Sequence, residues 1–147
     1  MPQSLSFVLI HLVFSTKDRA PLLTPNITAE LYPYLASVAR DAGCECYRIG
    51  GVEDHIHLAI RLSRTATIAH LVEQLKTCSS KWLKPKSRNF AWQRGYAAFS
   101  TNPSDADTLI HYIDTQEDHH QKYDFQEELR ALLKKYGIEH DERYMWD

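Results

Sequence analysis

The sequence predicts an α+β fold in which helices pack against an antiparallel sheet, and three observations lead to this prediction. Stretches with strand-like apolar patterns recur along the chain. Stretches with apolar residues at helical spacing separate them. Gly50-Gly51 joins two of the strand-like stretches, and so short a connection suits an antiparallel pair. A chain of 147 residues can bury a core of its own, so we expect one domain over residues 1–147.

The first half of the chain is expected to form a strand, a helix and two further strands. Residues 4–15 are rich in Phe, Val, Leu and Ile on both faces, as in a strand buried in the middle of a sheet. Apolar residues at helical spacing begin near Ile27, and Gly43 ends that helix. Residues 44–49 and 52–62 are the two strands that the glycine pair joins.

The second half is expected to add a helix, a strand and two more helices. Thr67 can cap a helix that Pro85 ends, and the aromatic residues 90–101 predict a fourth strand. The later helices are expected over residues 105–120 and 127–136. The order strand, helix, strand, strand, helix, strand predicts a ferredoxin-like sandwich with helices on one face of the sheet. The last two helices would be additions to that core.

The strand over residues 52–62 carries a candidate metal site. His55 and His57 fall on one face of the strand, while Ile56 and Leu58 fall on the other. Two strand rises separate the imidazoles by about 6.6 Å, so both can bind one metal ion without distorting the backbone. A half-buried edge strand with two incidental histidines remains the alternative interpretation. Asp54 is either a partner that orients an imidazole or a turn residue before the strand.

The expected helix over residues 105–120 offers an oxygen ligand and a phenol on one face. Tyr112 and Gln116 are four residues apart, so they are neighbours on a helix. The amide oxygen of Gln116 is an adequate ligand for a hard cation. Combined with His55 and His57 it gives a site with two nitrogens, one oxygen and open positions, which suits Mg²⁺ or Mn²⁺. His119 and His120 are a second, lower-ranked ligand pair, and His11 is more simply a buried polar residue.

Such a site predicts phosphodiester chemistry with a tyrosine nucleophile. A cation bound on one side polarises the phosphodiester, and the hydroxyl of Tyr112 attacks it. The resulting phosphotyrosine bond keeps the energy of the phosphodiester, so the strand can be rejoined without ATP. Alternatively, Tyr112 only packs against the sheet, and Tyr96 and Tyr123 are rival nucleophiles.

Positive charge is concentrated in residues 76–94, which we call the basic segment. The net charge of the chain is only −2, yet this segment holds six basic residues and no acid. Residues 105–147, in contrast, hold five basic and twelve acidic residues. The six candidates for contacts to DNA phosphates are Lys76, Lys81, Lys84, Lys86, Arg88 and Arg94. Trp82 and Trp92 could stack on unpaired bases, although an ordinary solvated surface explains the same pattern.

Neither a membrane segment nor a secreted disulfide framework is expected. The longest apolar run is too short to cross a bilayer and is interrupted by His11. The three cysteines are odd in number and match no zinc spacing, so we expect reduced cysteines and a cytoplasmic protein without a membrane partner.

Several motifs together resemble the single-tyrosine HUH transposases of the insertion-sequence-200-like family, which includes the REP-associated tyrosine transposases. His55-Ile56-His57 followed by Tyr112-x-x-x-Gln116 is the characteristic pair of motifs. Residues 11–19 and 92–100 resemble the family's first and fourth strands, and residues 125–147 resemble the C-terminus of one branch. Gln116 and this C-terminal match favour the insertion-sequence type over the REP-associated type.

The resemblance implies a metal-dependent transposase that cleaves single-stranded DNA through a 5′-phosphotyrosine link and recognises a hairpin. It implies Tyr112 as the nucleophile, His55, His57 and Gln116 as metal ligands, and a homodimer. Two other classes stay open. One is a non-catalytic nucleic-acid-binding module of the same fold. The other, a phosphoesterase with paired histidine motifs, would need a second His-x-Ser/Thr motif, and none is evident in the sequence.

Overall fold

A four-stranded antiparallel sheet forms the centre of the computed structural model, which describes residues 2–147. The strands are β1 (Val8–Ser15), β2 (Glu45–Gly51), β3 (His55–Leu62) and β4 (Ala97–Thr101). Their order across the sheet is β2-β3-β1-β4, so β1 and β3 are central. The expected antiparallel hairpin between β2 and β3 is present, but its turn is Val52-Glu53-Asp54, because Gly50 and Gly51 belong to β2 and pair with His57 and Ile56.

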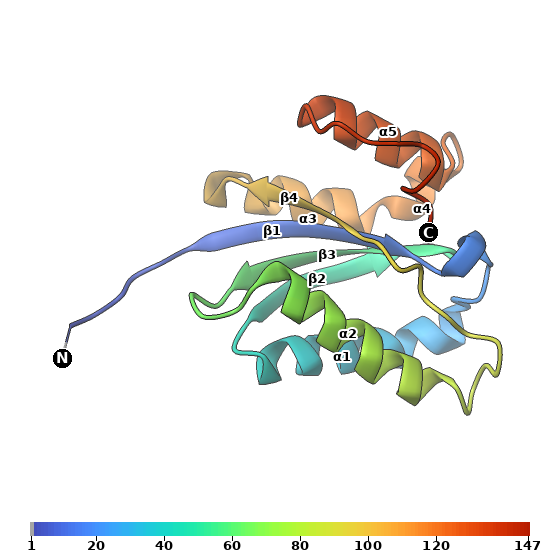
Figure 1. Cartoon of the computed structure of the whole chain (residues 1–147), viewed down its shortest axis with the longest axis horizontal. Coiled ribbons are helices and arrows are strands. Elements are labelled where there is room, and N and C mark those ends of the chain that lie inside the picture. The colour runs from blue at the N-terminus through green and yellow to red at the C-terminus, as the bar shows by residue number, and fades with distance from the viewer. Residues whose placement is uncertain (1) are drawn as a thin grey trace.

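Helices cover both faces of this sheet (Figure 1). On one face lie α1 (Pro25–Asp41) and α2 (Ile68–Leu83), which form the ferredoxin-like layer. On the opposite face lie α3 (Ala106–Asp114), the short α4 (Gln116–His120) and α5 (Phe125–Lys135). Single 3₁₀ turns, η1 (Lys17–Arg19) and η2 (Pro103–Asp105), follow β1 and precede α3. The predicted α+β class, with a tyrosine helix and a C-terminal helix added to the sandwich, is therefore confirmed.

Alternation along the central strands sends side chains into two different layers. Ile56, Leu58 and Ile60 of β3 are fully buried in the main core against α1 and α2. On the other face, α5 packs through Phe125, Leu129 and Leu133 against β1 and β4. Meanwhile α3 packs through Leu109 and Ile113 against Ala59 of β3. The two helices thus leave a space between them over the middle of the sheet, and the candidate site lies there.

Glycine at position 50 allows α3 to approach the sheet. A methyl group added to Gly50 would lie 2.6 Å from the carbonyl oxygen of Ile113 and 2.8 Å from its Cγ2 atom. Any larger residue would push the end of α3 away from β2. Because Ile113 directly follows Tyr112, this contact fixes the height of the tyrosine above the sheet.

Three predicted elements differ from the structure, each for a physical reason. Strand β1 begins at Val8 rather than at residue 4, because β3 ends at the partner of Val8 and offers no further backbone groups. The helix expected over 105–120 breaks at Thr115, whose φ and ψ are −104° and 22°. The strand expected over 90–101 covers only its last five residues.

The ammonium of Lys76 explains the shorter fourth strand. It donates hydrogen bonds to the carbonyl oxygens of Gln93 at 2.8 Å, Arg94 at 3.3 Å and Gly95 at 2.6 Å. Those carbonyl groups are therefore hydrogen-bonded to a side chain instead of a neighbouring strand.

Among the described helices, none is long and apolar enough to cross a membrane.

Candidate metal centre and tyrosine site

The two histidines of β3 point into the space between α3 and α5. Both His55 and His57 have no exposed surface, and they lie on the face opposite the main core. The predicted alternation is therefore confirmed, and the edge-strand alternative is wrong because β3 lies between β1 and β2. The register places His57 opposite Val13 and His55 opposite Ser15, at the end of the sheet where β1 finishes.

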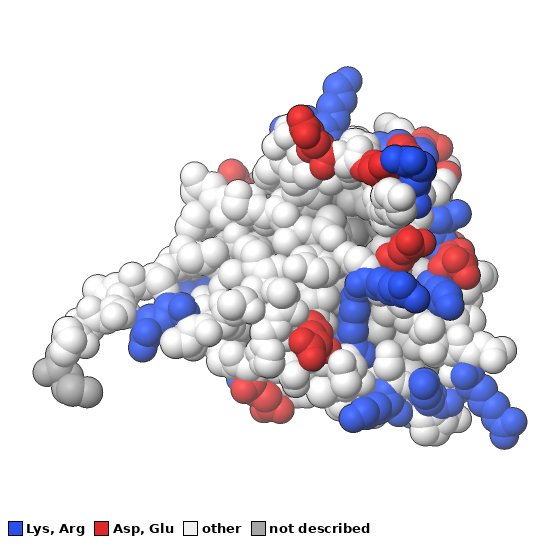
Figure 2. Space-filling model, in the orientation of Figure 1, with Lys and Arg blue, Asp and Glu red and all other residues white. Residues whose placement is uncertain are grey.

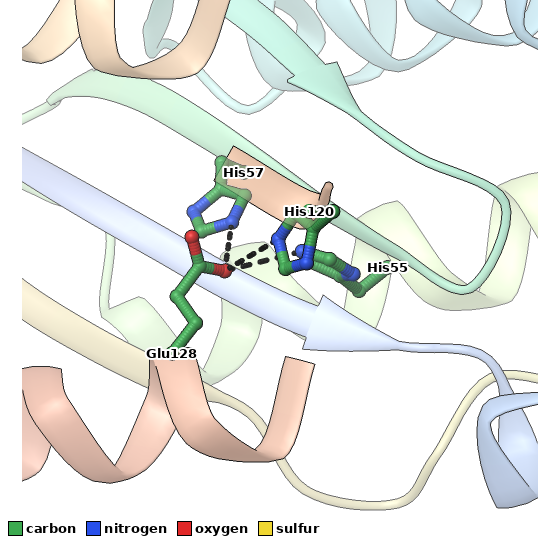
Figure 3. A group of neighbouring side chains, drawn as sticks. All are labelled: His55, His57, His120 and Glu128. Carbon is green, nitrogen blue, oxygen red and sulfur yellow. Dashed lines mark hydrogen bonds and ion pairs between the residues drawn. The ribbon is translucent and has the colours of Figure 1, made fainter. Parts of the chain in front are cut away.

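A carboxylate from α5 lies among these histidines (Figure 3). Oε1 of Glu128 is 2.9 Å from Nε2 of His57 and 3.2 Å from Nε2 of His55. Nε2 of His120, at the end of α4, is also 3.2 Å from the same oxygen. One ligand atom from each of the four residues fits within 4.8 Å of all the others. One β-strand and two helices thus bring three imidazoles and one carboxylate to a single point.

Tyr112 and Gln116 reach the same group from α3 and α4. The hydroxyl of Tyr112 donates a 2.5 Å hydrogen bond to Oε2 of Glu128, and the amide of Gln116 donates to that oxygen at 3.2 Å. Oε1 of Gln116 lies 3.3 Å from Nε2 of His55 and 3.0 Å from Nε2 of His120. The structure therefore brings the predicted nucleophile and all three predicted ligands together.

Each β3 histidine has a further partner on its Nδ1 atom. Nδ1 of His55 lies 2.7 Å from Oδ1 of Asp54, and since a carboxylate only accepts, the histidine donates. Nδ1 of His57 lies 2.7 Å from Nε2 of His11 on β1. Such partners fix ring orientation and leave both Nε2 atoms directed at the common centre. Asp54 therefore orients an imidazole, and His11 is part of the site.

Burial and charge set the protonation states in opposite directions. Burial lowers the pKa of His55, but the hydrogen bonds to Asp54 and Glu128 raise this pKa by more than burial lowers it. The net result is a pKa of about 9. Burial dominates at His57 and lowers its pKa. Burial and the neighbouring His57 also lower the pKa of His11, to about 3. Hydrogen bonds from the three imidazoles outweigh burial at Glu128 and hold its pKa well below the usual range.

The pKa of Tyr112 is shifted upward. Burial is the largest cause, and the negative charge of Glu128 and the hydrogen bond to it add to the effect. A phenol in this environment stays protonated at neutral pH, so its activation as a nucleophile requires positive charge nearby. The four-residue group is suited to supply that charge, because imidazole nitrogens and a carboxylate oxygen are ligands for divalent transition metals and Mn²⁺.

Glu128 is absent from the ligands predicted from the sequence, although a signal for it exists there. On α5 the buried residues Phe125, Leu129 and Leu133 form an apolar stripe, and Glu128 lies within that stripe. A carboxylate at such a position needs a buried partner. His120 ranks below Gln116 on sequence grounds, but it enters the group. Its neighbour His119 instead packs against the Tyr112 ring, with centroids 4.7 Å apart.

One lysine of the basic segment is hydrogen-bonded to backbone carbonyl groups, and the other five basic residues are exposed. Lys76 is directed at backbone carbonyl groups, as described above. The exposed residues are Lys81, Lys84, Lys86, Arg88 and Arg94. Lys and Arg side chains gather at the end of the molecule where α2 finishes (Figure 2). Gln93, next to Arg94, bonds to the backbone of Ser15, the residue opposite His55, so this end of the segment adjoins the site.

Neither tryptophan of the segment offers a free stacking face, which corrects that part of the sequence analysis. Trp92 is buried in the main core, and its indole donates to the hydroxyl of Ser79 at 2.8 Å. Trp82 stacks on Tyr34 with centroids 5.2 Å apart, and the ammonium of Lys86 lies 4.6 Å from its ring centre. Both indoles contribute to packing because the segment folds against α1 and β1.

A cavity of about 500 Å³ adjoins the tyrosine. Its lining includes His11 of β1, Tyr112 of α3, and Lys135 and Tyr136 at the end of α5. The cavity lies on the side of Tyr112 away from the basic segment, so the tyrosine borders open space as well as the buried group.

The chain is similar to known proteins in both sequence and fold. Residues 4–116 match the sequence profile of the family described as "Transposase IS200 like". A solved structure of a protein from Deinococcus radiodurans R1, assigned as a transposase, has a TM-score of 0.64 and 19% identity, and the alignment covers 79% of this chain and 95% of the other. A REP-associated tyrosine transposase bound to a REP hairpin has a TM-score of 0.60 and 15% identity over 82% of this chain and 74% of the other. No curated protein matches the chain in sequence.

Proposed function

The chain belongs to the IS200-like transposase family, and on that premise we propose that it cleaves and rejoins single-stranded DNA through a covalent link to Tyr112. One observation carries the proposal: the hydroxyl of Tyr112 lies beside a buried group of metal-ligand type that contains both histidines of β3. A tyrosine that served only in packing would not need its hydroxyl directed at such a group. The likeness to the two solved structures supports the fold on which this arrangement stands.

In the proposed reaction, the oxygen of Tyr112 attacks the phosphorus of a phosphodiester. A bond forms between the phenol oxygen and phosphorus while the bond to the 3′ oxygen breaks, and this oxygen takes up a proton from water, which leaves a 5′-phosphotyrosine and a free 3′-hydroxyl. The proton of the phenol has an acceptor at 2.5 Å in Oε2 of Glu128. Attack by a 3′-hydroxyl on the phosphotyrosine reverses these changes and rejoins the strand.

His55, His57 and Gln116 would hold a single Mg²⁺ or Mn²⁺ ion. The donor set fits, because imidazole nitrogens and an amide oxygen are ligands that such ions accept, and Oε1 of Gln116 lies 3.3 Å from Nε2 of His55. When bound, such an ion polarises the phosphodiester and offsets the charge that develops on it. Asp54 and His11 hold the two imidazoles in place through their Nδ1 atoms.

We further propose that the substrate is single-stranded DNA with a hairpin. The exposed part of the basic segment can bind phosphates, and its C-terminal end adjoins the site through Gln93, which bonds to the backbone of Ser15. The REP-associated neighbour is described as bound to a REP hairpin, which supports a structured strand here as well. These contacts to the backbone would position the DNA without determining its sequence.

We also propose that residues 1–147 act as one domain and that two copies form a homodimer. Support for one domain comes from α5, because its Glu128 completes a group built on the sheet. The dimer rests on the family resemblance. Sedimentation at tens of micromolar measures it directly, and a monomer that cleaves in proportion to its concentration would overturn it.

Covalent trapping tests the proposed reaction. The protein is incubated with labelled hairpin-bearing single-stranded DNA and Mn²⁺, then denatured and separated by size. We expect a protein–DNA species that resists denaturation, depends on the ion and disappears in chelator. A matched blunt duplex is the control substrate. Tight DNA binding without any covalent species would instead identify a binding module without catalysis.

A further inference from the structure

We infer that Glu128 is itself a ligand of the metal ion and that the ion thereby fastens α5 onto the sheet. This inference rests on the metal site of the proposed function and adds a fourth protein ligand to it. Glu128 lies beyond residues 4–116, which match the family, so the family match does not include it. The geometry of one carboxylate oxygen carries the argument.

Oε1 of Glu128 lies where three ligand atoms converge. It is within 3.2 Å of the Nε2 atoms of His55, His57 and His120, and all three rings are directed at it (Figure 3). A hard carboxylate oxygen among imidazole nitrogens is the mixed donor set that Mn²⁺ and related ions accept. Oε1 of Glu128 and one nitrogen each of His55, His57 and His120 lie within 4.8 Å of one another, so small side-chain movements would admit an ion among them.

The burial of Glu128 is costly without a strong positive partner. It is 7% exposed, and within the described part of the chain it is the only acidic residue that is buried. A buried charge is tolerated when it is paired or binds a metal. Its present partners are the three imidazoles, the hydroxyl of Tyr112 and the amide of Gln116, and a divalent ion would add positive charge at the same point.

The second oxygen of Glu128 connects the ion to the nucleophile. Oε2 accepts hydrogen bonds from the hydroxyl of Tyr112 and from the amide of Gln116. A carboxylate that bound the ion through Oε1 would keep Oε2 directed at the phenol. Glu128 would then hold Tyr112 at a fixed distance from the ion, so one residue would set both the metal affinity and the placement of the tyrosine.

The same bond would attach the C-terminal helix. The residues of α5 pack on the sheet through Phe125, Leu129 and Leu133, and residues 121–124 before them are exposed. Helix α5 carries exposed charges along its outer face, and Glu128 is the charged residue on its inner face. Binding of the ion should therefore slow local opening of α5 more than opening of α1 or α2.

Titration calorimetry with Mn²⁺ tests whether Glu128 is a ligand. We expect Glu128→Gln to weaken binding at least about tenfold, the scale on which even residues outside the coordination sphere act. The matched control is Glu127→Gln, which removes the same charge from an exposed neighbour on the same helix and should leave affinity within about twofold. Circular dichroism in chelator confirms that each variant is folded. Glu128→Asp shortens the side chain by one CH₂ group and moves the carboxylate away from the centre, so it should also bind Mn²⁺ weakly.

Three outcomes contradict the inference in distinguishable ways. If Glu128→Gln bound Mn²⁺ as tightly as the wild type, or more tightly, the carboxylate would not be a ligand. The ion would instead displace it from the centre of the group. If His57→Ala lost binding while both Glu128 variants kept it, the proposed metal site would stand and only this inference would fall. A wild-type protein that bound no Mn²⁺ would overturn both.

Hydrogen exchange gives a reading that does not depend on affinity alone. Saturating Mn²⁺ should slow exchange of the α5 amides several-fold in the wild type, whereas the amides of α1 should change little. The Glu128→Gln variant at an equally saturating concentration should show no such protection. Protection of α5 in that variant would mean that the helix is fastened in another way.

Discussion

The hydroxyl of Tyr112 and the carboxylate of Glu128 form a 2.5 Å hydrogen bond between two helices that pack on different strands of the sheet. Helix α3 lies over β3 and β2, while α5 lies over β1 and β4. The bond spans the space between them and points the phenol at the histidines of β3. The candidate nucleophile is therefore positioned by packing on both sides of the site.

Replacing Tyr112 by Phe removes this hydroxyl and keeps the ring. We expect loss of the covalent DNA species and of cleavage, with DNA binding within about twofold of the wild type. The variant should lose about 1.5–3 kcal/mol of stability, since a hydrogen bond to a charged group is removed. Peptide mapping of the wild-type adduct separates Tyr112 from Tyr96 and Tyr123. DNA found on either of those two residues would contradict the assignment.

Reversing charge at Lys81 and Lys84 should weaken binding of single-stranded DNA similarly for every sequence. Both side chains are exposed, so the change should act through phosphates and leave the fold intact. The dependence of log affinity on log salt should become shallower by about 0.7 for each phosphate that the variant no longer neutralises. Lys122→Glu, an exposed reversal outside the basic segment, is the control. An unchanged salt dependence in the double variant would exclude these lysines from the interface.

Gly50→Ala should disturb the site without touching any residue in it. The added methyl group would lie 2.6 Å from the carbonyl oxygen of Ile113, so the end of α3 must move. Overpacking of this kind costs about 1–3 kcal/mol, measurable by urea unfolding. Cleavage should fall further than stability, because Tyr112 moves with Ile113. In the control Gly95→Ala, the methyl group would be 3.3 Å from its nearest neighbour and should cost less.

The contribution of His55 to the stability of the metal-free protein should fall as pH rises from about 6.5 to about 9. Partners raise the pKa of His55 from 6.5 to about 9, so the folded state binds the extra proton across that window. A group whose pKa is higher in the folded state than in the unfolded state stabilises the fold fully at pH values below its unfolded pKa. This stabilisation is lost as the pH rises through the folded pKa. Thermal midpoints in chelator measure this directly.

Asp54→Asn provides the matched comparison for that pH dependence. It removes the carboxylate that lies 2.7 Å from Nδ1 of His55, so the decline between about pH 6.5 and about pH 9 should become smaller. Asp118→Asn, an exposed change nearby in the chain, should leave the decline as it is in the wild type. Equal declines in all three proteins would mean that another group titrates in this window.

Alternation and local spacing were enough to predict the sheet and one side of the site. The two faces of β3 follow from alternation, which depends only on the geometry of an extended chain, so the burial of Ile56 and the placement of His55 and His57 could be predicted. The order of the elements along the chain, the antiparallel pairing of β2 with β3 and the four-residue spacing of Tyr112 and Gln116 could likewise be predicted from local patterns.

Which residues face those histidines depends on how distant segments pack, and no local pattern contains that information. Glu128 lies 71 residues from His57, and the packing of α5 on β1 and β4 selects it in preference to its exposed neighbour Glu127. His120 is four residues from Gln116 within α4, so its place beside that residue follows from helical spacing, whereas its contact with Glu128 depends on how α5 packs. Charge and aromaticity are visible in the sequence and suggest a DNA surface for Lys76 and Trp92. Their actual partners, three carbonyl groups and the hydroxyl of Ser79, are brought to them by contacts between segments far apart in the chain.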